Sequence, residues 1–175
     1  GKSFATSGLA STILGGWQLS GLMSIFGGRP FSAISSAASL NAVNSSQFAD
    51  CNGSAQQTGD IYNWYDRSAF SAPTGSPRFG TCGLDSLRGP GLFNMDAGLE
   101  KKFAFHERYN FSFRLEAFNL GNTPHHASPG YNSSTGTTPA NNVTSSSFMQ
   151  AFEIANTGRD GVDQRTLRLA LKVTF

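Results

Sequence analysis

The sequence has few charged residues and no long hydrophobic run. Charged residues make up 14% of its 175 positions and the formal net charge is +2, whereas an ordinary soluble domain has about 25% charged residues. Because the cationic residues are spread along the chain, no basic stripe indicates a nucleic-acid partner. No segment approaches the roughly 20 apolar residues of a transmembrane helix. A nucleic-acid-binding protein and a helical membrane protein are therefore not expected.

Cysteine is scarce, and combinations of residues that carry out catalysis are missing. Two cysteines can form one disulfide, so disulfides cannot be the main scaffold. We find no paired carboxylates, no recognisable Ser/His/Asp set and no Cys-x-x-Cys pair, so neither an enzyme nor a cofactor is expected. His125 and His126 are adjacent and would point to opposite sides of an extended chain. Together with the distant His106 they do not predict a metal site.

What the sequence does have is aromatic residues and strict alternation of apolar and polar positions. It contains 15 Phe and 20 Gly. In the clearest run, apolar residues at odd positions from Tyr109 to Ala117 alternate with polar residues at even positions from Asn110 to Glu116. A period of two predicts β-strands. Similar runs predict four strands, over about 16–27, 93–105, 109–120 and 164–175.

Two all-β architectures fit this alternation. In a soluble sandwich the apolar faces pack together and the charged faces meet water. In an outer-membrane barrel the apolar face meets lipid and the charged face lines a wet lumen. Strands of about 9–12 residues exceed the mode of about 5–6 in soluble sheets and match the roughly 9–11 residues that cross a membrane. The strand length therefore favours the barrel.

The connections between the strands are very unequal, which also favours a barrel. A short turn at 106–108 contrasts with long segments over 28–92 and 121–163, and outer-membrane barrels have short periplasmic turns and long extracellular loops. With Phe175 at the periplasmic rim, both long segments are expected outside. This orientation requires 148–154 to belong to a loop, because a further spanning strand there would invert the pattern.

Six phrases of the sequence are distinctive: Leu14 to Gly21 (LGGWQLSG), Trp64 to Phe70 (WYDRSAF), Arg78 to Gly83 (RFGTCG), Arg88 to Asp96 (RGPGLFNMD), Phe113 to Leu120 (FRLEAFNL) and Asn122 to His125 (NTPH). They resemble one family, the Oar-like TonB-dependent outer-membrane receptors that are abundant in acidobacteria. The resemblance covers nearly the whole chain. It departs from the wider TonB-dependent class at Gly121, where an aromatic residue is usual.

This resemblance implies an all-β, antiparallel transmembrane barrel of 22 strands around an N-terminal plug, in the bacterial outer membrane. Residues 1–175 would supply its last four strands and two long extracellular loops. The implied partners are the rest of the barrel and the plug, the TonB complex, the outer-membrane assembly machinery, the lipid bilayer and an extracellular substrate. The implied function is energised uptake of a large or scarce substrate, whose identity the two long segments do not reveal.

The barrel interpretation assigns roles to individual residues. Cys51 and Cys82 share one segment expected on the oxidising exterior, so a disulfide between them is expected. The alternating last strand resembles an assembly signal, read by strand addition, that consists of Leu167, Leu169, Leu171, Val173 and Phe175. An interfacial aromatic girdle would contain Trp17, Phe103 and Tyr109. The residues expected to face the lumen are Glu100, Lys102, Arg114, Glu116, Arg168 and Lys172.

Two other functions remain open from the sequence. A soluble secreted β-sandwich could act as an adhesin or carbohydrate-binding module, and its mark would be a stable monomer in water. A passive porin would keep the alternating strands but would need neither plug nor TonB.

Overall fold

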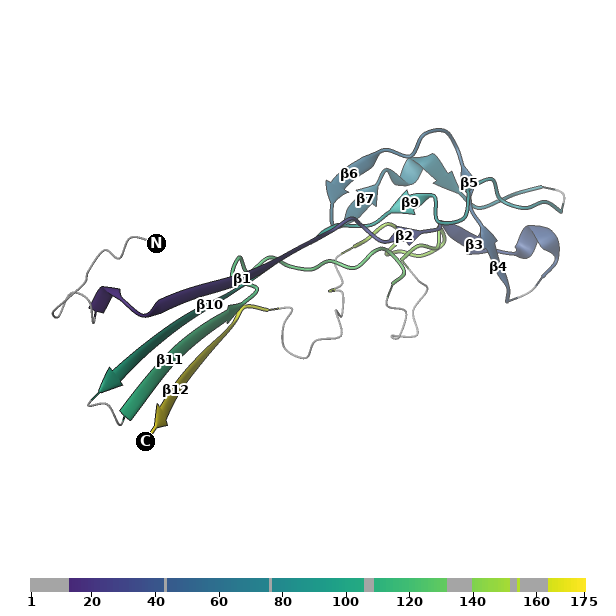
Figure 1. Cartoon of the computed structure of the whole chain (residues 1–175). Helices are drawn as coiled ribbons and strands as arrows, with labels where there is room; N and C mark the ends of the chain where they lie inside the picture. Colours follow the sequence, from purple (N-terminus) through teal and green to yellow (C-terminus); the bar gives the residue numbers. More distant parts are fainter. Residues whose placement is uncertain are drawn as a thin grey trace. The chain divides into compact units, whose positions relative to one another are not determined.

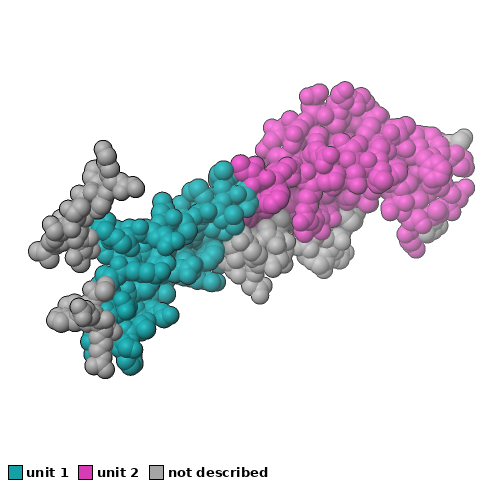
Figure 2. Space-filling view, in the orientation of Figure 1, with its two compact units in different colours: residues 1–24, 93–123, 159–175 teal, residues 25–92, 124–158 magenta. Residues whose placement is uncertain are grey.

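A computed structural model of the chain describes residues 13–42, 44–75, 77–105, 109–131, 140–151, 154 and 164–175. Its named elements are β-strands and two single-turn 3₁₀ helices. Among the described residues, no helix is long and apolar enough to cross a membrane. The chain divides into two compact units (Figure 2), one of residues 1–24, 93–123 and 159–175 and the other of residues 25–92 and 124–158. We call these the strand unit and the loop unit.

Four long strands form one sheet in the order β1-β10-β11-β12 (Figure 1). These are β1 (Trp17–Phe26), β10 (Leu92–Phe105), β11 (Tyr109–Phe118) and β12 (Thr166–Thr174). Strands β10, β11 and β12 pair antiparallel. These segments form strands because apolar and polar residues alternate along most of each run. Within the described part of the chain β1 and β12 are edge strands, so the sheet is not closed into a barrel.

The register of the sheet is continuous over nine residue pairs on each side of β11. Leu99 lies opposite Leu115, which lies opposite Leu169. One step along the strands, Glu100 lies opposite Arg114 and Arg114 lies opposite Ala170. Because side chains alternate between faces, the register collects the odd-numbered, mostly apolar residues of β10, β11 and β12 on one face. The even-numbered polar residues share the other.

The loop unit is built from short two-stranded ladders. The four ladders pair β2 with β9, β3 with β4, β5 with β8 and β6 with β7. The bounds are β2 (Pro30–Phe31), β3 (Ile34–Ser36), η1 (Ala38–Leu40), β4 (Ser46–Phe48), β5 (Asp50–Cys51), β6 (Gln57–Asp60), β7 (Asn63–Tyr65), η2 (Arg67–Ala69), β8 (Phe70–Ser71) and β9 (Leu87–Arg88).

A hydrophobic core holds the loop unit together, and both long segments contribute to it. Phe31, Tyr65, Phe70 and Leu87 of the first segment are buried with Phe148 and Met149 of the second. The backbones also join: Val143 N–H donates to the Ile34 carbonyl at 2.9 Å and Trp64 N–H to the Met149 carbonyl at 2.8 Å. The sequence predicted two separate long loops, over 28–92 and 121–163. They are instead one folded unit, because their scattered aromatic residues meet in a shared core.

The segment 148–154, which could have been a strand or part of a loop, belongs to the loop unit where it is described. Phe148, Met149 and Ala151 are buried, and none of residues 148–151 lies in a strand. Ile154 forms an isolated bridge to His126. Met149 has a φ of +60°, which lies outside the extended conformation of a strand.

Candidate functional site

Charged residues gather on one face of the sheet, which we call the polar face. Strands β10, β11 and β12 place the six residues predicted to face a lumen at even positions, so all six share this face. Glu100 lies opposite Arg114, and Glu116 lies opposite Arg168. Opposite charges at directly paired positions stabilise a sheet. The arrangement therefore explains how so many charges are accommodated side by side.

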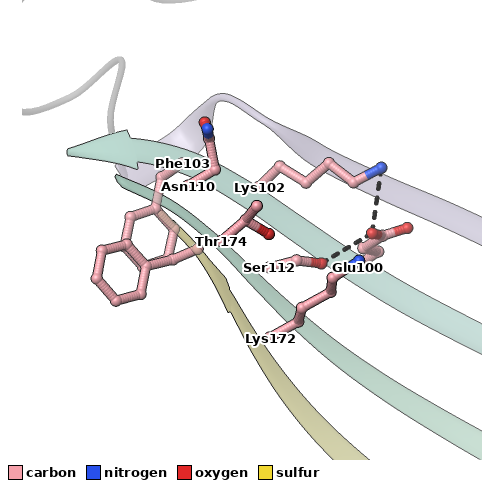
Figure 3. A pocket seen from close by; sticks show the side chains of 8 residues that line it. Glu100, Lys102, Phe103, Asn110, Ser112, Lys172 and Thr174 are labelled. Atoms are coloured by element: carbon pink, nitrogen blue, oxygen red, sulfur yellow. Dashed lines mark hydrogen bonds and ion pairs between the residues drawn. The ribbon is translucent and has the colours of Figure 1, made fainter. Parts of the chain in front are cut away.

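The charges on the polar face also form ion pairs along β10, which Figure 3 shows, and along β11. Lys102 Nζ lies 3.2 Å from Glu100 Oε1, which accepts a hydrogen bond from Ser112 Oγ at 2.9 Å. On β11, Arg114 Nη2 lies 2.7 Å from Glu116 Oε1. On β12, the Arg168 guanidinium lies 4.9 Å from the centre of the Phe118 ring. One row across the three strands consists of Lys102, Ser112 and Lys172. This cationic row lies beside the row that contains Glu100 and Arg114.

A pocket of about 570 Å³ lies on this row (Figure 3), and its lining includes Glu100, Lys102, Ser112 and Lys172. Charged and hydroxyl groups in this number require water or a polar partner, because burying them in hydrocarbon without partners costs several kcal/mol each. The polar face can therefore line a wet channel or contact a polar protein surface, and it cannot face lipid tails.

The opposite face of the sheet is apolar and exposed. On β12, Leu167, Leu169 and Leu171 are 64–70% exposed, and Phe175, just after the strand, is 90% exposed. Val173 shares their parity. Leu19 and Met23 of β1 are exposed as well. An apolar surface of this kind is unfavourable in water and favourable against lipid. The five residues of the predicted assembly signal all belong to it, and their recognition by assembly machinery stays a prediction.

Trp17, Phe103 and Tyr109 lie at one end of the sheet. Lys102 N–H donates to the Gly16 carbonyl at 3.1 Å, which places the start of β1 beside the end of β10, and Phe105 pairs with Tyr109. Phe103 stacks on Phe111 with ring centres 5.3 Å apart. An interfacial girdle needs its aromatic residues at the same end of the strands, and these three meet that condition. The girdle itself remains a prediction.

Lys101 is a charged residue that the sequence analysis missed. It lies on the apolar face, where its Nζ donates to the Ile13 carbonyl at 2.6 Å and lies 4.7 Å from the centre of the Trp17 ring. Aromatic residues attract cations through their ring faces. The odd position of Lys101 was the available signal, since it has the parity of Leu99 and Phe103.

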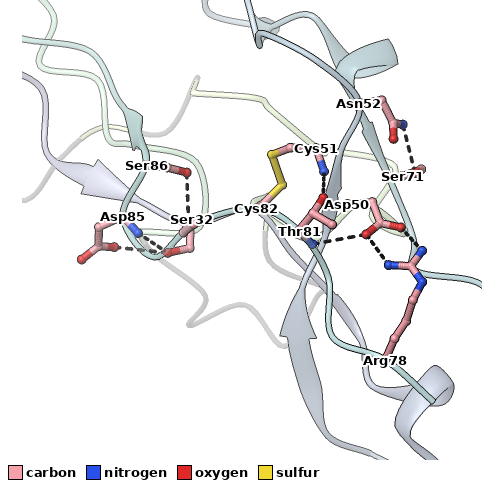
Figure 4. The surroundings of a disulfide bond; sticks show 11 residues. Ser32, Asp50, Cys51, Asn52, Ser71, Arg78, Thr81, Cys82, Asp85 and Ser86 are labelled. Carbon is pink, nitrogen blue, oxygen red and sulfur yellow. Dashed lines mark hydrogen bonds and ion pairs between the residues drawn. A yellow bond between two sulfur atoms is a disulfide. The ribbon is translucent and has the colours of Figure 1, made fainter.

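Cys51 and Cys82 form a disulfide in the loop unit, with Cα atoms 5.0 Å apart (Figure 4). The backbone around it is tied by side chains: Cys51 N–H donates to Thr81 Oγ1 at 3.0 Å, and Thr81 N–H donates to Asp50 Oδ1 at 3.2 Å. Arg78 completes this cluster by pairing with the Asp50 carboxylate. Its hydrogen bonds hold the pKa of Asp50 below the usual range, although partial burial acts in the opposite direction.

The described residues contain no group of three or more His, Cys, Asp or Glu placed to hold a metal ion. His125 is buried in the loop unit, and His106 lies outside the described residues. The arrangement that the structure does offer consists of a two-faced sheet and a disulfide-linked loop unit.

Comparison with known families shows which family has this two-faced sheet. Comparisons with curated proteins and with solved structures give no match. A family model described as an outer membrane beta barrel domain matches residues 1–161, which is most of the chain and includes three of the four long strands. The two-faced sheet is the pattern that such barrels need, with lipid on one side and water on the other. The chain therefore belongs to the outer-membrane β-barrel domain family, and its place is the bacterial outer membrane.

Proposed function

We propose that the chain is the C-terminal wall segment of a TonB-dependent outer-membrane receptor of the Oar-like type. The whole protein would bind a large or scarce substrate outside the cell and take it up with energy delivered through TonB. This chain would contribute four barrel strands, an outer binding unit and no catalysis. Its partners would be the remaining barrel strands, a plug, the assembly machinery and the lipid bilayer.

The observation that carries this proposal is the folded loop unit. A single core formed by Phe70, Phe148 and their neighbours joins the two long segments, and the Cys51–Cys82 disulfide crosslinks the first of them. Such a unit is a shaped surface on which a large ligand can dock without first ordering flexible loops. The sequence phrases shared with Oar-like receptors support the same function.

The polar face is consistent with a plugged barrel. Paired charges such as Glu100–Lys102 and Arg114–Glu116 supply a hydrated wall that a plug can contact through polar groups. A passive porin is the alternative that shares this wall. A soluble sandwich is no longer tenable, because the family belongs to the outer membrane.

Cysteine labelling of the complete protein in living cells separates the plugged receptor from the porin. We would replace Ser112, on the polar face, by cysteine, and add a water-soluble thiol reagent to the medium. A plug that fills the barrel should make labelling of Ser112→Cys several-fold slower than labelling of Ser36→Cys, which is exposed in the loop unit. The native cysteines do not interfere because they are bonded to each other.

The same experiment provides a control variant and an outcome that would contradict the proposal. Leu169→Cys, on the apolar face, should resist the reagent because it faces lipid. Equally fast labelling of Ser112→Cys and Ser36→Cys would indicate an open pore and contradict the receptor proposal. Crosslinking of the complete protein to TonB in the same cells is expected for the receptor and not for a porin.

A further inference from the structure

A smaller pocket, of about 230 Å³, lies entirely within the loop unit. One side is formed by Arg67 of η2 and by Phe70 and Ser71 of β8, and the other by residues 143–145 and Phe148. Phe70 and Phe148 meet edge to face with ring centres 5.6 Å apart. The two sides come from different long segments, so the pocket exists only because these segments fold together.

Arg67 is the one ionisable residue among the described residues that line this pocket. Its Nη2 donates to the Tyr62 carbonyl at 3.2 Å, whereas its Nε is buried and has no hydrogen-bond partner in the described part of the chain. The planar guanidinium fork of Arg67 matches the two oxygens of a carboxylate, so Arg67 is the group of this lining that suits an anionic ligand.

Ser71 is a second lining residue that can donate to an acceptor ligand. Ser71 Oγ accepts a hydrogen bond from Asn52 Nδ2 at 3.1 Å, so its own proton can be donated. Asp66, the neighbour of Arg67 in the sequence, has its Oδ1 engaged by Ser68 N–H at 3.0 Å and by Ser68 Oγ at 2.8 Å. Among the described residues that line the pocket, none carries a carboxylate. The pocket therefore offers hydrogen-bond donors and positive charge.

Apolar side chains make up the rest of the lining, namely Phe70, Ala72, Val143 and Phe148. The volume of about 230 Å³ is below the roughly 300 Å³ at which sites for drug-sized molecules begin. A small ligand with one charged end and an apolar body matches this volume and lining.

We propose that the loop unit binds a small monocarboxylate with an apolar body in this pocket, with Arg67 and Ser71 holding the carboxylate and Phe70 and Phe148 packing on the body. Benzoate is the simplest probe with this chemistry. The proposal goes beyond transport, because a purified protein can show this binding whether or not TonB acts on it.

Equilibrium dialysis of radiolabelled benzoate against the complete protein, purified in detergent, tests the site. We expect saturable binding to one site. Arg67→Gln should weaken it by about tenfold or more, because a charge-assisted hydrogen bond is lost. Arg88→Gln removes the same charge from an exposed residue of the loop unit that does not line the pocket, so its affinity should stay within about twofold of the original. Unlabelled benzamide, which is neutral and has the same shape, should not compete.

A second variant keeps the test decisive if Arg67→Gln does not fold. Ala72→Leu fills the pocket from its wall and leaves the guanidinium in place, so benzoate binding should disappear while the disulfide still forms. Absence of saturable benzoate binding, equal effects of Arg67→Gln and Arg88→Gln, or effective competition by benzamide would each overturn the proposal. The cysteine-labelling result for the receptor is independent of all three outcomes.

Discussion

Arg78 donates two hydrogen bonds to Asp50, one to each carboxylate oxygen, at 2.8 and 2.5 Å. This two-point contact joins residues 28 positions apart, beside the disulfide that links Cys51 to Cys82. Paired, parallel hydrogen bonds of this kind fix both distance and orientation. The pair thus positions the backbone on both sides of the disulfide, and it makes the stability of the loop unit sensitive to pH.

The stability of the loop unit should fall in acid in a way that depends on Asp50. The hydrogen bonds from Arg78 lower the pKa of Asp50 below its ordinary value, so the folded state binds the proton less readily than the unfolded chain. The contribution is therefore complete above the unfolded pKa of about 3.9 and is lost as pH falls through the lower, folded pKa. Trp64 fluorescence during urea unfolding at a series of pH values would measure this. The difference between the original protein and Asp50→Asn should shrink below about pH 4, and a constant difference would contradict the assignment.

Removing the disulfide should destabilise the loop unit and leave the long strands paired. Cys51 and Cys82 are separated by 31 positions, and closing a loop of this length contributes about 3–4 kcal/mol in the chain-entropy model. The double variant Cys51→Ser/Cys82→Ser should lower the urea midpoint reported by Trp64. A matched pair, Ser36→Ala and Ser46→Ala, removes two exposed hydroxyls from the same unit and should have little effect. Unchanged unfolding of the cysteine variant would show that the core alone holds the unit.

A charge on the apolar face should be harmful, whereas the same charge one residue away should be tolerated. Leu169→Glu would place a carboxylate against lipid and is expected to cost about 1–2 kcal/mol, somewhat less than a central Arg or Lys. Ala170→Glu would lie on the polar face directly opposite Arg114, where the charge is matched. The folded, heat-modifiable fraction in outer membranes measures the difference. Equal tolerance of both substitutions would mean that the apolar face does not meet lipid.

Gly80 should not tolerate a side chain. A Cβ at this position would collide with the backbone carbonyls of Phe48 and Ala49, which lie beside β5 and the disulfide. Because backbone cannot move aside as a flexible side chain can, Gly80→Ala is expected to cost about 1–3 kcal/mol. Gly27→Ala is the control, since a Cβ there meets nothing within 4 Å. Thermal unfolding of the two variants measures the contrast, and similar midpoints would contradict it.

The sheet could be predicted from the sequence because neighbouring residues of a strand face the two opposite sides of the sheet. Tyr109 to Ala117 alternates without interruption, and the faces of Glu100, Lys102, Arg114, Glu116, Arg168 and Lys172 follow from parity alone. Lys101 could have been placed on the apolar face by the same rule. Its contacts with the Ile13 carbonyl and the Trp17 ring could not, because they depend on how β1 pairs with β10.

The fold of the loop unit could not be predicted from the sequence. Its residues follow no period, and its contacts join distant positions: Asn141 Nδ2 donates to the Ser32 carbonyl at 2.9 Å across 109 positions. Nothing local marks Asp50 and Arg78 as partners, or Arg67 and Phe148 as walls of one pocket.

The alternating strands and their two faces could be read from the sequence alone, since they follow from neighbours two residues apart. The turn predicted at 106–108 lies outside the described residues. The shared core of the two long segments, the contact between Arg78 and Asp50 and the pocket at Arg67 exist only in the folded chain, because burial of scattered aromatic residues such as Phe70 and Phe148 is cooperative. This burial brings together segments whose own hydrophobic patterns are too weak to predict a fold from the sequence.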